Sequence, residues 1–390
     1  MNRIMNSMAR RVTVPGLLLV VCALWVTMQP FAASAADVNP GTVTAWGYNG
    51  LGCLGDGTTV GSSTTPVSVL LPPGVTALAV AAGAFHNLAI TDGGLYVWGD
   101  GANVPVNVVF PPTATTAAAI AAGTYHSLAL TDDGLYAWGG NGSGQLGDGT
   151  TTDRTAPVQV LFPSTVTTIS AIAAGAYHSL ALTDDGLYAW GSNGSGQLGN
   201  GTYAEQTVPV KVAFPSTVTT LRAISAGGFH SLAITNDGVY AWGNNTFGQL
   251  GNGTTTGSAR PTKVVFQKKT RPAAVTDIAA GFWHSLAIGD NTVYGWGFNG
   301  NGELGDGTGV AQVSPVKALF PRRTPLMVTA IAAGSMHSLA ITDNGLYAWG
   351  SNASGQLGMQ GANRYTPTKV QAERNVIDIG AGYYHSLALH

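Results

Sequence analysis

Histidine is the residue type in this sequence that first invites a chemical interpretation, because seven of its eight copies share one context. Each is followed by Ser-Leu-Ala or Asn-Leu-Ala; they are His86, His126, His178, His230, His284, His337 and His385. Imidazoles bind metals and transfer protons. Equivalent positions on packed sheets lie about 10 Å apart, however, whereas a zinc–nitrogen bond is about 2.1 Å long. We therefore expect no metal site, and buried imidazoles hydrogen-bonded to the backbone.

Catalysis finds no support elsewhere in the chain. Serine, histidine and aspartate are plentiful only as repeated positions, and no single triad or carboxylate pair stands apart from the repeat. The Gly-Gln-Leu-Gly-Asp-Gly-Thr segments have the composition of calcium loops but lack their acidic spacing and terminal glutamate. We expect these segments to be turns, and the protein to be neither an enzyme nor a cofactor carrier.

The elements that position these histidines follow from a second series, seven Trp-Gly steps. Their tryptophans are Trp46, Trp98, Trp138, Trp190, Trp242, Trp296 and Trp349, spaced 52, 40, 52, 52, 54 and 53 residues apart. Repeats of this length made of short strands are typical of propeller blades. Each repeat contains four strand-like segments, such as AIAAG, HSLALT, LYAWGS and APVQVLF, separated by turn residues. The sequence predicts an all-β, seven-bladed propeller of four-stranded blades.

Strand alternation and the ends of the repeat array indicate how the ring packs and closes. In the second strand His178 and Leu180 share one face, and Ser179 and Ala181 the other, so a large face can pack on a small one. The array starts with TVTAWG, a third-strand segment at residue 42, and ends with YYHSLALH, a second-strand segment. We expect these N- and C-terminal strands to pair and complete a blade.

The first 36 residues have the pattern of a secretory signal peptide. Arg3, Arg10 and Arg11 precede an apolar run over residues 12–26, and small residues follow at 33–36. We predict one propeller domain over residues 37–390, located outside the cell, in the periplasm or on the cell surface. That part holds a single cysteine, Cys53, so it forms no internal disulfide.

Composition also bears on the partner. Residues 37–390 contain 14 Lys and Arg against 19 Asp and Glu, a net charge of −5, which disfavours nucleic acid. We expect a monomer that binds another protein or a cell-surface polymer and that does not insert into a membrane once the signal is removed.

The repeated segment HSLALTDDGLYAWGSNGSGQLG resembles the repeat of the regulator of chromosome condensation (RCC1) family, over residues 40 to 390. The resemblance implies a seven-bladed propeller, and the family name points to nucleotide exchange on a small GTPase. An exported chain would not meet cytosolic GTPases, and no repeat carries a long inserted wedge, so we do not expect that activity. A non-catalytic interaction scaffold is the function we predict.

The residue before each histidine is large and varies between repeats: Phe85, Tyr125, Tyr177, Phe229, Trp283, Met336 and Tyr384. The turn between the two innermost strands places this position around one mouth of the central channel. The side chains form either an exposed apolar binding surface or an inward plug of the channel. We take them as candidate partner-binding residues, with Tyr177, Phe229 and Trp283 as the first candidates.

Two alternative functions rest on the same ring. Secreted propeller-type β-lactamase inhibitors are similar at Tyr125, Tyr177, Phe229 and Trp283, whereas Met336 and the longer GQLG loops depart from them. This similarity implies an inhibitor of a secreted or periplasmic enzyme. A carbohydrate-binding or lytic propeller would also expose aromatic residues.

Basic residues form a secondary candidate site. Eleven of the 14 in residues 37–390 lie between Arg260 and Arg374, and two connections concentrate them: Lys268, Lys269 and Arg271, and Arg322 and Arg323. These connections are expected on the face opposite the aromatic ring, together with acidic turns such as Asp184-Asp185. The face either attracts an acidic partner or polyanion or is a solvated rim.

One repeat departs from the rest. Only 40 residues separate Trp98 from Trp138, and GDGANVPVNVVF stands where the other repeats carry a GQLG loop. We expect a notch in the rim at this repeat, wide enough to admit a loop of a partner.

Overall fold

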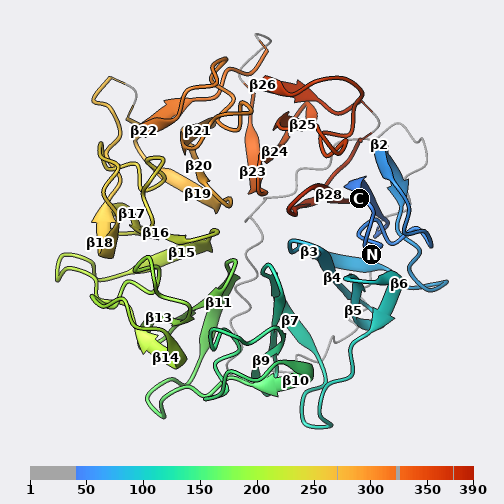
Figure 1. Ribbon diagram of the computed structural model, residues 1–390, viewed down its shortest axis with the longest axis horizontal. Coiled ribbons are helices and arrows are strands. Elements are labelled where there is room, and N and C mark those ends of the chain that lie inside the picture. Colours follow the sequence, from blue (N-terminus) through green and yellow to red (C-terminus); the bar gives the residue numbers. More distant parts are fainter. Residues whose placement is uncertain (1–40, 270, 322–325, 372) are drawn as a thin grey trace, which may run out of the picture.

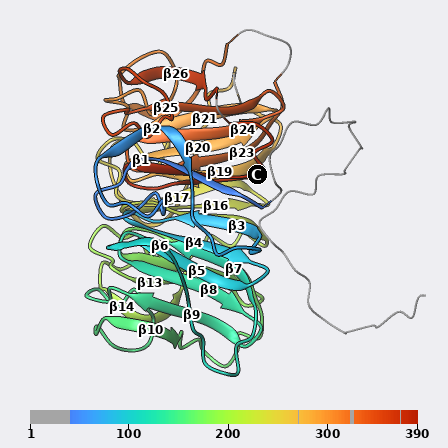
Figure 2. The same cartoon turned by 90° about the vertical axis from the view of Figure 1, so that its right-hand side faces the viewer.

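The computed structural model describes residues 41–390 except 270, 322–325 and 372. Seven antiparallel four-stranded sheets stand around a central axis like the blades of a propeller, with their innermost strands converging on the centre (Figure 1). Seen from the side, the strands cross the thickness of the ring (Figure 2). The predicted all-β, seven-bladed fold is confirmed.

The strands of the first four blades, in chain order from the closing blade, are as follows. The closing blade contains β1 (Val43–Tyr48), β2 (Ser62–Ser68), β27 (Asp378–Ala381) and β28 (His385–Leu389). The next three contain β3 (Ala77–Ala82), β4 (His86–Thr91), β5 (Gly94–Gly99) and β6 (Ala102–Asn107); β7 (Ala117–Ala122), β8 (His126–Thr131), β9 (Gly134–Gly139) and β10 (Arg154–Gln159); and β11 (Ile169–Ala174), β12 (His178–Thr183), β13 (Gly186–Gly191) and β14 (Gln206–Lys211).

The other three blades repeat the pattern. They contain β15 (Leu221–Ala226), β16 (His230–Thr235), β17 (Gly238–Gly243) and β18 (Ser258–Lys263); β19 (Val275–Ala280), β20 (His284–Gly289), β21 (Thr292–Gly297) and β22 (Gln312–Lys317); and β23 (Val328–Ala333), β24 (His337–Thr342), β25 (Gly345–Gly350) and β26 (Arg364–Lys369).

Closure occurs as the sequence predicts. Strand β28 lies between β1 and β27 in the closing blade, in a register that pairs Val43 with Leu389 and Gly47 with His385. The strand order β2-β1-β28-β27 thus combines both ends of the described chain in one sheet, and β1 and β28 are each paired on both sides.

Within a blade, the turn between the second and third strands is tight. In the blade β11–β14 the register runs from His178↔Gly191 to Thr183↔Gly186, which leaves Asp184 and Asp185 as the turn. Gly186 has a φ of 121°, a left-handed value that glycine adopts at little cost. The histidine and the Trp-Gly step therefore lie at one end of the sheet, and the acidic turn lies at the other.

Neighbouring blades pack through the two faces of the second strand, on which large and small residues alternate as the sequence predicts. Leu180 and Leu182 of one blade lie in a cluster with Ala233 and Trp242 of the next. Burying a leucine side chain stabilises the fold by about 1.5–3 kcal/mol, and the arrangement recurs around the ring. The core is therefore a set of interfaces between neighbouring blades, with large residues facing small ones.

The histidines are buried, but our expectation of a backbone partner is wrong. His178 Nε2 lies 2.9 Å from Ser231 Oγ in the next blade, and five more boundaries repeat this histidine–serine pair. The serine hydroxyl donates in turn to the carbonyl of Gln197, so the imidazole Nε2 is the donor to the serine. Burial lowers the pKa of His178 to about 3, which keeps the ring neutral at physiological pH. The imidazoles thus connect neighbouring blades.

The glycine-rich loops between third and fourth strands also join neighbouring blades. In the loop after β13, the Asn193 side chain accepts the N–H of Leu198 and donates to the carbonyl of Thr202. This fixes the Gln197 carbonyl, which accepts both Trp242 Nε1 and Ser231 Oγ of the next blade at 2.9 Å. Each such loop therefore covers the tryptophan of the blade that follows it.

Some predictions made from the sequence concern residues outside the described part of the chain. The proposed signal peptide, residues 1–36, belongs to them, as do Arg322 and Arg323. Within residues 41–390, gaps excepted, no helix has the length and apolar character needed to cross a membrane.

Candidate functional site

The turns between the first and second strands hold the ring of large residues rigidly. In each, a glycine precedes the ring residue by two positions. A Cβ on Gly227 would lie 2.4 Å from the carbonyl oxygen of Gly281 in the next blade, and only glycine permits that approach. The amide of Gly228 donates to the same oxygen. Among the described residues, similar backbone hydrogen bonds join neighbouring turns at five other boundaries.

The seven candidate residues lie on these turns, at the same end of every blade. Tyr125 is the most open of them, with half of its surface exposed. The other six are half-buried: Phe85, Tyr177, Phe229, Trp283, Met336 and Tyr384. The structure thus gathers all seven on one face of the ring, which we call the aromatic face.

Most of these side chains contact one another in sequence around the ring. Tyr125 lies 6.0 Å from Tyr177, Tyr177 lies 6.3 Å from Phe229, and Phe229 lies 5.2 Å from Trp283, measured between ring centroids. Spacings of 4.5–7 Å are those at which aromatic rings attract each other. The four residues form a continuous arc over four blades.

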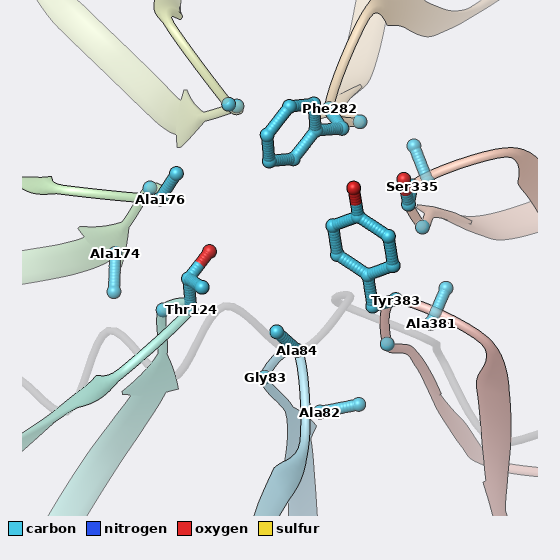
Figure 3. Close-up of a pocket in the computed structure, with 18 of the residues that line it drawn as sticks. Ala82, Gly83, Ala84, Thr124, Ala174, Ala176, Phe282, Ser335, Ala381 and Tyr383 are labelled. Atoms are coloured by element: carbon cyan, nitrogen blue, oxygen red, sulfur yellow. The ribbon is translucent and has the colours of Figure 1, made fainter. Parts of the chain in front are cut away.

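Two further aromatic residues, missed in the sequence analysis, occupy the mouth of the channel. The rings of Phe282 and Tyr383 extend into the centre, whereas Ala84, Thr124 and Ala176 stay at its edge (Figure 3). Their centroids are 5.4 Å apart, and they bound a cavity of about 170 Å³.

The inward plug is therefore supplied chiefly by Phe282 and Tyr383 rather than by the seven ring residues. The sequence held a signal for this. The position two before the histidine is Ala, Thr, Gly or Ser in the other five repeats, and it is aromatic only at these two.

The loops widen the aromatic face. Phe247, from the loop after β17, lies 5.5 Å from Trp283 and 5.0 Å from Phe298. Tyr48, at the end of β1, lies 6.4 Å from Phe85 and 6.3 Å from Tyr384. None of these three loop-side residues was singled out from the sequence, because each belongs to only one or two repeats.

The face offers apolar contact and neutral hydroxyl groups. Burial raises the pKa of Tyr177 and of Tyr384 above the usual tyrosine value, so both phenols stay protonated at physiological pH. Half-buried aromatic rings on a fixed backbone lose little conformational freedom on binding. Among residues 41–390, gaps aside, no three His, Cys, Asp or Glu side chains are grouped so that they could hold a metal ion.

The secondary candidates lie at the other end of the blades. Lys268, Lys269 and Arg271 are exposed in the connection between β18 and β19. Arg271 and Arg222 line a cavity of about 670 Å³ beside the Asp237 turn. The acidic turns there are partly neutralised, because Lys211 pairs with Asp185 at 2.7 Å and Lys263 pairs with Asp237 at 2.6 Å.

The family model described as an RCC1-like domain matches residues 102–388, and the RCC1 repeat model matches residues 40–90. The chain belongs to the RCC1-like family. Among curated members, the Arabidopsis thaliana ultraviolet-B receptor UVR8 is 32% identical over 336 residues, which cover 85% of this chain and 66% of UVR8. The mitochondrial RCC1 domain-containing protein RUG3 of the same plant is 32% identical over 93% of this chain and 92% of its own.

Solved structures agree in fold. Human WBSCR16 superposes with a TM-score of 0.77 at 23% identity, over 89% of this chain and 99% of its own. Prp20p from Saccharomyces cerevisiae, reported with its binding properties to Gsp1p and histones, gives 0.77 at 22% identity, over 90% and 92%. At these identities the likeness establishes the RCC1-like propeller fold and nothing finer.

Proposed function

We propose that this RCC1-like propeller is a non-catalytic binding protein that holds a protein partner on its aromatic face. The observation that carries the proposal is the arc from Tyr125 through Tyr177 and Phe229 to Trp283, fixed on turns that are hydrogen-bonded to one another. Aromatic residues on rigid backbone are the usual anchors of protein interfaces.

The relatives support a binding role at a coarser level. Prp20p is described as binding Gsp1p and histones, and yeast RCC1 (Prp20) has been crystallised with Kap60. The HERC6 protein, a probable E3 ubiquitin-protein ligase, is matched over only 22% of its length. We therefore transfer binding, and no ligase chemistry, to this chain.

We propose further that the protein is exported and acts as a monomer. The support is the pattern of residues 1–36, with arginines before an apolar run and small residues after it. Since RUG3 is mitochondrial, the location needs a direct test. N-terminal sequencing of the protein recovered from the medium or envelope should begin near residue 37, and recovery of the intact N-terminus from the cytosol would contradict export.

The binding role is tested by comparing two variants that alter opposite faces. The first is Tyr177→Ala/Phe229→Ala/Trp283→Ala, and the matched control is Lys268→Ala/Lys269→Ala/Arg271→Ala. Proteins captured from the secretome and envelope of the producing cell are identified, and their affinities for both variants are measured. We expect the first variant to lose at least tenfold in affinity and the control to lose little. The reverse result would move the site to the basic connections.

A second candidate, inhibition of a secreted hydrolase, is favoured by the four-residue arc, which coincides with the positions shared with β-lactamase-inhibitor propellers. If the captured partner is an enzyme, its activity is titrated with the protein. Stoichiometric loss of activity that the triple alanine variant does not cause would establish inhibition.

A further inference from the structure

One blade boundary lacks the loop that covers the tryptophan at the other six. Six tryptophans donate their indole N–H to a carbonyl of the preceding loop; the acceptors are Gln356, Cys53, Gln145, Gln197, Gln249 and Glu303. The blade β3–β6 has only Asp100 and Gly101 between its third and fourth strands, so it has no loop to offer Trp138 of the next blade.

Two side chains are left without a loop carbonyl as a result. At the other boundaries the same carbonyl also accepts a second side chain, as Gln145 does from Ser179. Among the described residues, the indole N–H of Trp138 has no acceptor, and the Ser127 hydroxyl has His86 Nε2 as its partner at 2.9 Å, in place of a loop carbonyl. Both side chains are more than nine-tenths buried, at 8% and 2% exposure. The indole N–H of Trp138 is not among the fully buried unpaired polar atoms, so solvent reaches it where the loop is missing.

An apolar position is uncovered beside these donors. The leucine of each loop is fully buried, and in the blade β19–β22 a Cβ on Gly295 would lie 3.0 Å from Leu304 Cα. The equivalent residue in the loopless blade is Val97, which pairs with Val106. Val106 is 51% exposed, whereas its counterparts, such as Val158 and Val210, are half-buried. The core cluster here is also thin, with four buried members: Leu88, Leu95, Ala129 and Trp138.

Tyr125 marks the edge of the same site. A Cβ on Gly191 would lie 3.1 Å from Gln145 Cα of the preceding loop, close to the ring residue Tyr177. The matching glycine beside Tyr125 is Gly139, which has no loop atom among its nearest neighbours. Tyr125 is the most exposed of the seven ring residues, and it lies beside the place of the missing loop. We call Val97, Val106, Ser127 and Trp138, with Tyr125 at their edge, the uncovered site.

We propose that the uncovered site binds a leucine-bearing, glycine-flanked turn of a partner protein, which places its main-chain carbonyl against Trp138 Nε1 and Ser127 Oγ and its leucine over Val97. At the six intact boundaries such a loop occupies this place, and its carbonyl accepts the tryptophan indole and a second side chain, a serine at five of them and Asn87 at the sixth. The inference rests on the proposed function, because the site opens on the aromatic face and extends the arc at Tyr125.

The occupant must come from another protein. The six loops of this chain that have the required sequence are engaged at their own boundaries, with their leucines buried. A partner turn whose carbonyl accepts from Trp138 and Ser127, and whose leucine fills an apolar position, supplies the directional contacts that the aromatic arc lacks. The uncovered site would therefore fix the position and orientation of the partner, while the aromatic arc supplies contact area.

The test uses the indole N–H of Trp138 as a reporter in the whole protein. Its resonance is assigned as the one that Trp138→Phe removes. A cyclised peptide with the sequence of residues 193–202, Asn-Gly-Ser-Gly-Gln-Leu-Gly-Asn-Gly-Thr, is titrated in. We expect a saturable downfield shift and slower hydrogen exchange of that N–H alone. The same peptide with its leucine changed to aspartate should have no effect. No shift with the leucine peptide, or equal shifts with both, would overturn the proposal.

A filled variant provides an independent check. Residues 100–101 are replaced by residues 192–205, which gives this blade the loop of the blade β11–β14. We expect the Trp138 N–H to become as protected as the other six, and the peptide to lose its effect. A folded filled variant whose Trp138 N–H still exchanges freely would overturn the proposal. If this variant does not fold, the peptide titration of the unaltered chain decides.

The two proposals fail in different ways. The Tyr177→Ala/Phe229→Ala/Trp283→Ala variant keeps the uncovered site and should respond to the peptide normally, even though it loses the partner. If that variant still binds the partner, and the leucine peptide still shifts the Trp138 N–H resonance, the proposal that the aromatic arc binds the partner is wrong and the proposal for the uncovered site stands. If the captured partner binds unaltered and filled proteins equally, the uncovered site is not used by it and the proposal is overturned.

Discussion

His385 Nε2 lies 2.6 Å from Oδ1 of Asn87, and this contact joins the closing blade to the first complete one across 298 residues of sequence. Asn87 also donates to the Cys53 carbonyl at 2.8 Å. At the six other boundaries a serine fills this position, so the asparagine is specific to the place where the ring closes. Its two hydrogen bonds are buried and therefore costly to remove.

Asn87→Ala should lower the free energy of unfolding by about 2–3 kcal/mol, because it leaves the His385 N–H buried and unpaired. Asn87→Ser should cost less, since serine accepts the histidine elsewhere in the ring. Urea unfolding monitored by tryptophan fluorescence measures both. An Asn87→Ala protein within about 0.5 kcal/mol of the unaltered one would show that the contact does not hold the closure.

The buried histidines should make the protein sensitive to acid. Burial lowers their pKa from the ordinary 6.5 to about 3, as for His178, or to about 4 for His86. Below pH 6.5 the unfolded chain therefore binds protons that the native chain does not, and stability falls as the pH falls. Each histidine contributes about 1.4 kcal/mol per pH unit in that window.

Seven such residues should exhaust a typical stability of about 5–15 kcal/mol within about two pH units below 6.5. Denaturant midpoints measured from pH 7.5 to 4.5 check this. A His178→Gln variant should reduce the slope by about one proton. A flat profile over this range would contradict the burial of neutral imidazoles.

Two tryptophans at equivalent positions should respond differently to the same change. Trp190→Phe removes the hydrogen bond to the Gln145 carbonyl, whereas Trp138→Phe removes none. Both lose similar apolar surface, so Trp190→Phe should cost about 1 kcal/mol more. Thermal or urea unfolding of the two variants gives the difference. Equal costs would mean that the loop–indole hydrogen bond contributes nothing.

The glycine turns should tolerate no side chain where the carbonyl of the next blade approaches. Gly227→Ala places a Cβ 2.4 Å from the Gly281 oxygen and should cost about 1–3 kcal/mol or more. Gly194→Ala is the matched control, because a Cβ there meets nothing within 4 Å. The two melting temperatures are compared; similar values would refute the close approach.

The sequence predicted the parts of the molecule that repeat. The blade count, the four strands, the closure by β1 and β28 and the placement of residues such as Tyr177 all follow from a period and an alternation that one chain displays many times. Contacts between different blades were harder to predict from the sequence. The serine partners of six histidines lie about one repeat away, and the loop that covers Trp242 belongs to the preceding blade, so neither is visible within a single repeat.

Features confined to one repeat were also difficult to predict. Phe282 and Tyr383 occupy a position that small residues fill elsewhere, and only the convergence of the inner strands shows that two rings there reach each other. The short repeat was visible in the sequence as a 40-residue spacing. Its structural consequence, the missing acceptor for Trp138, was not visible there. That consequence depends on knowing which carbonyl Trp138 would have used.

Each loop covers the tryptophan of the blade that follows it, so the blade without a loop leaves one boundary of the ring less stable than the others. Six boundaries must break a loop–indole hydrogen bond before two blades can separate, but the boundary between β6 and β7 has none to break. Thermal opening of the ring should therefore begin there, as local unfolding favours the least bonded unit. The seven boundaries are therefore unequal in stability. The ring should open first between the blades β3–β6 and β7–β10, and not in the blade where the two ends of the chain pair.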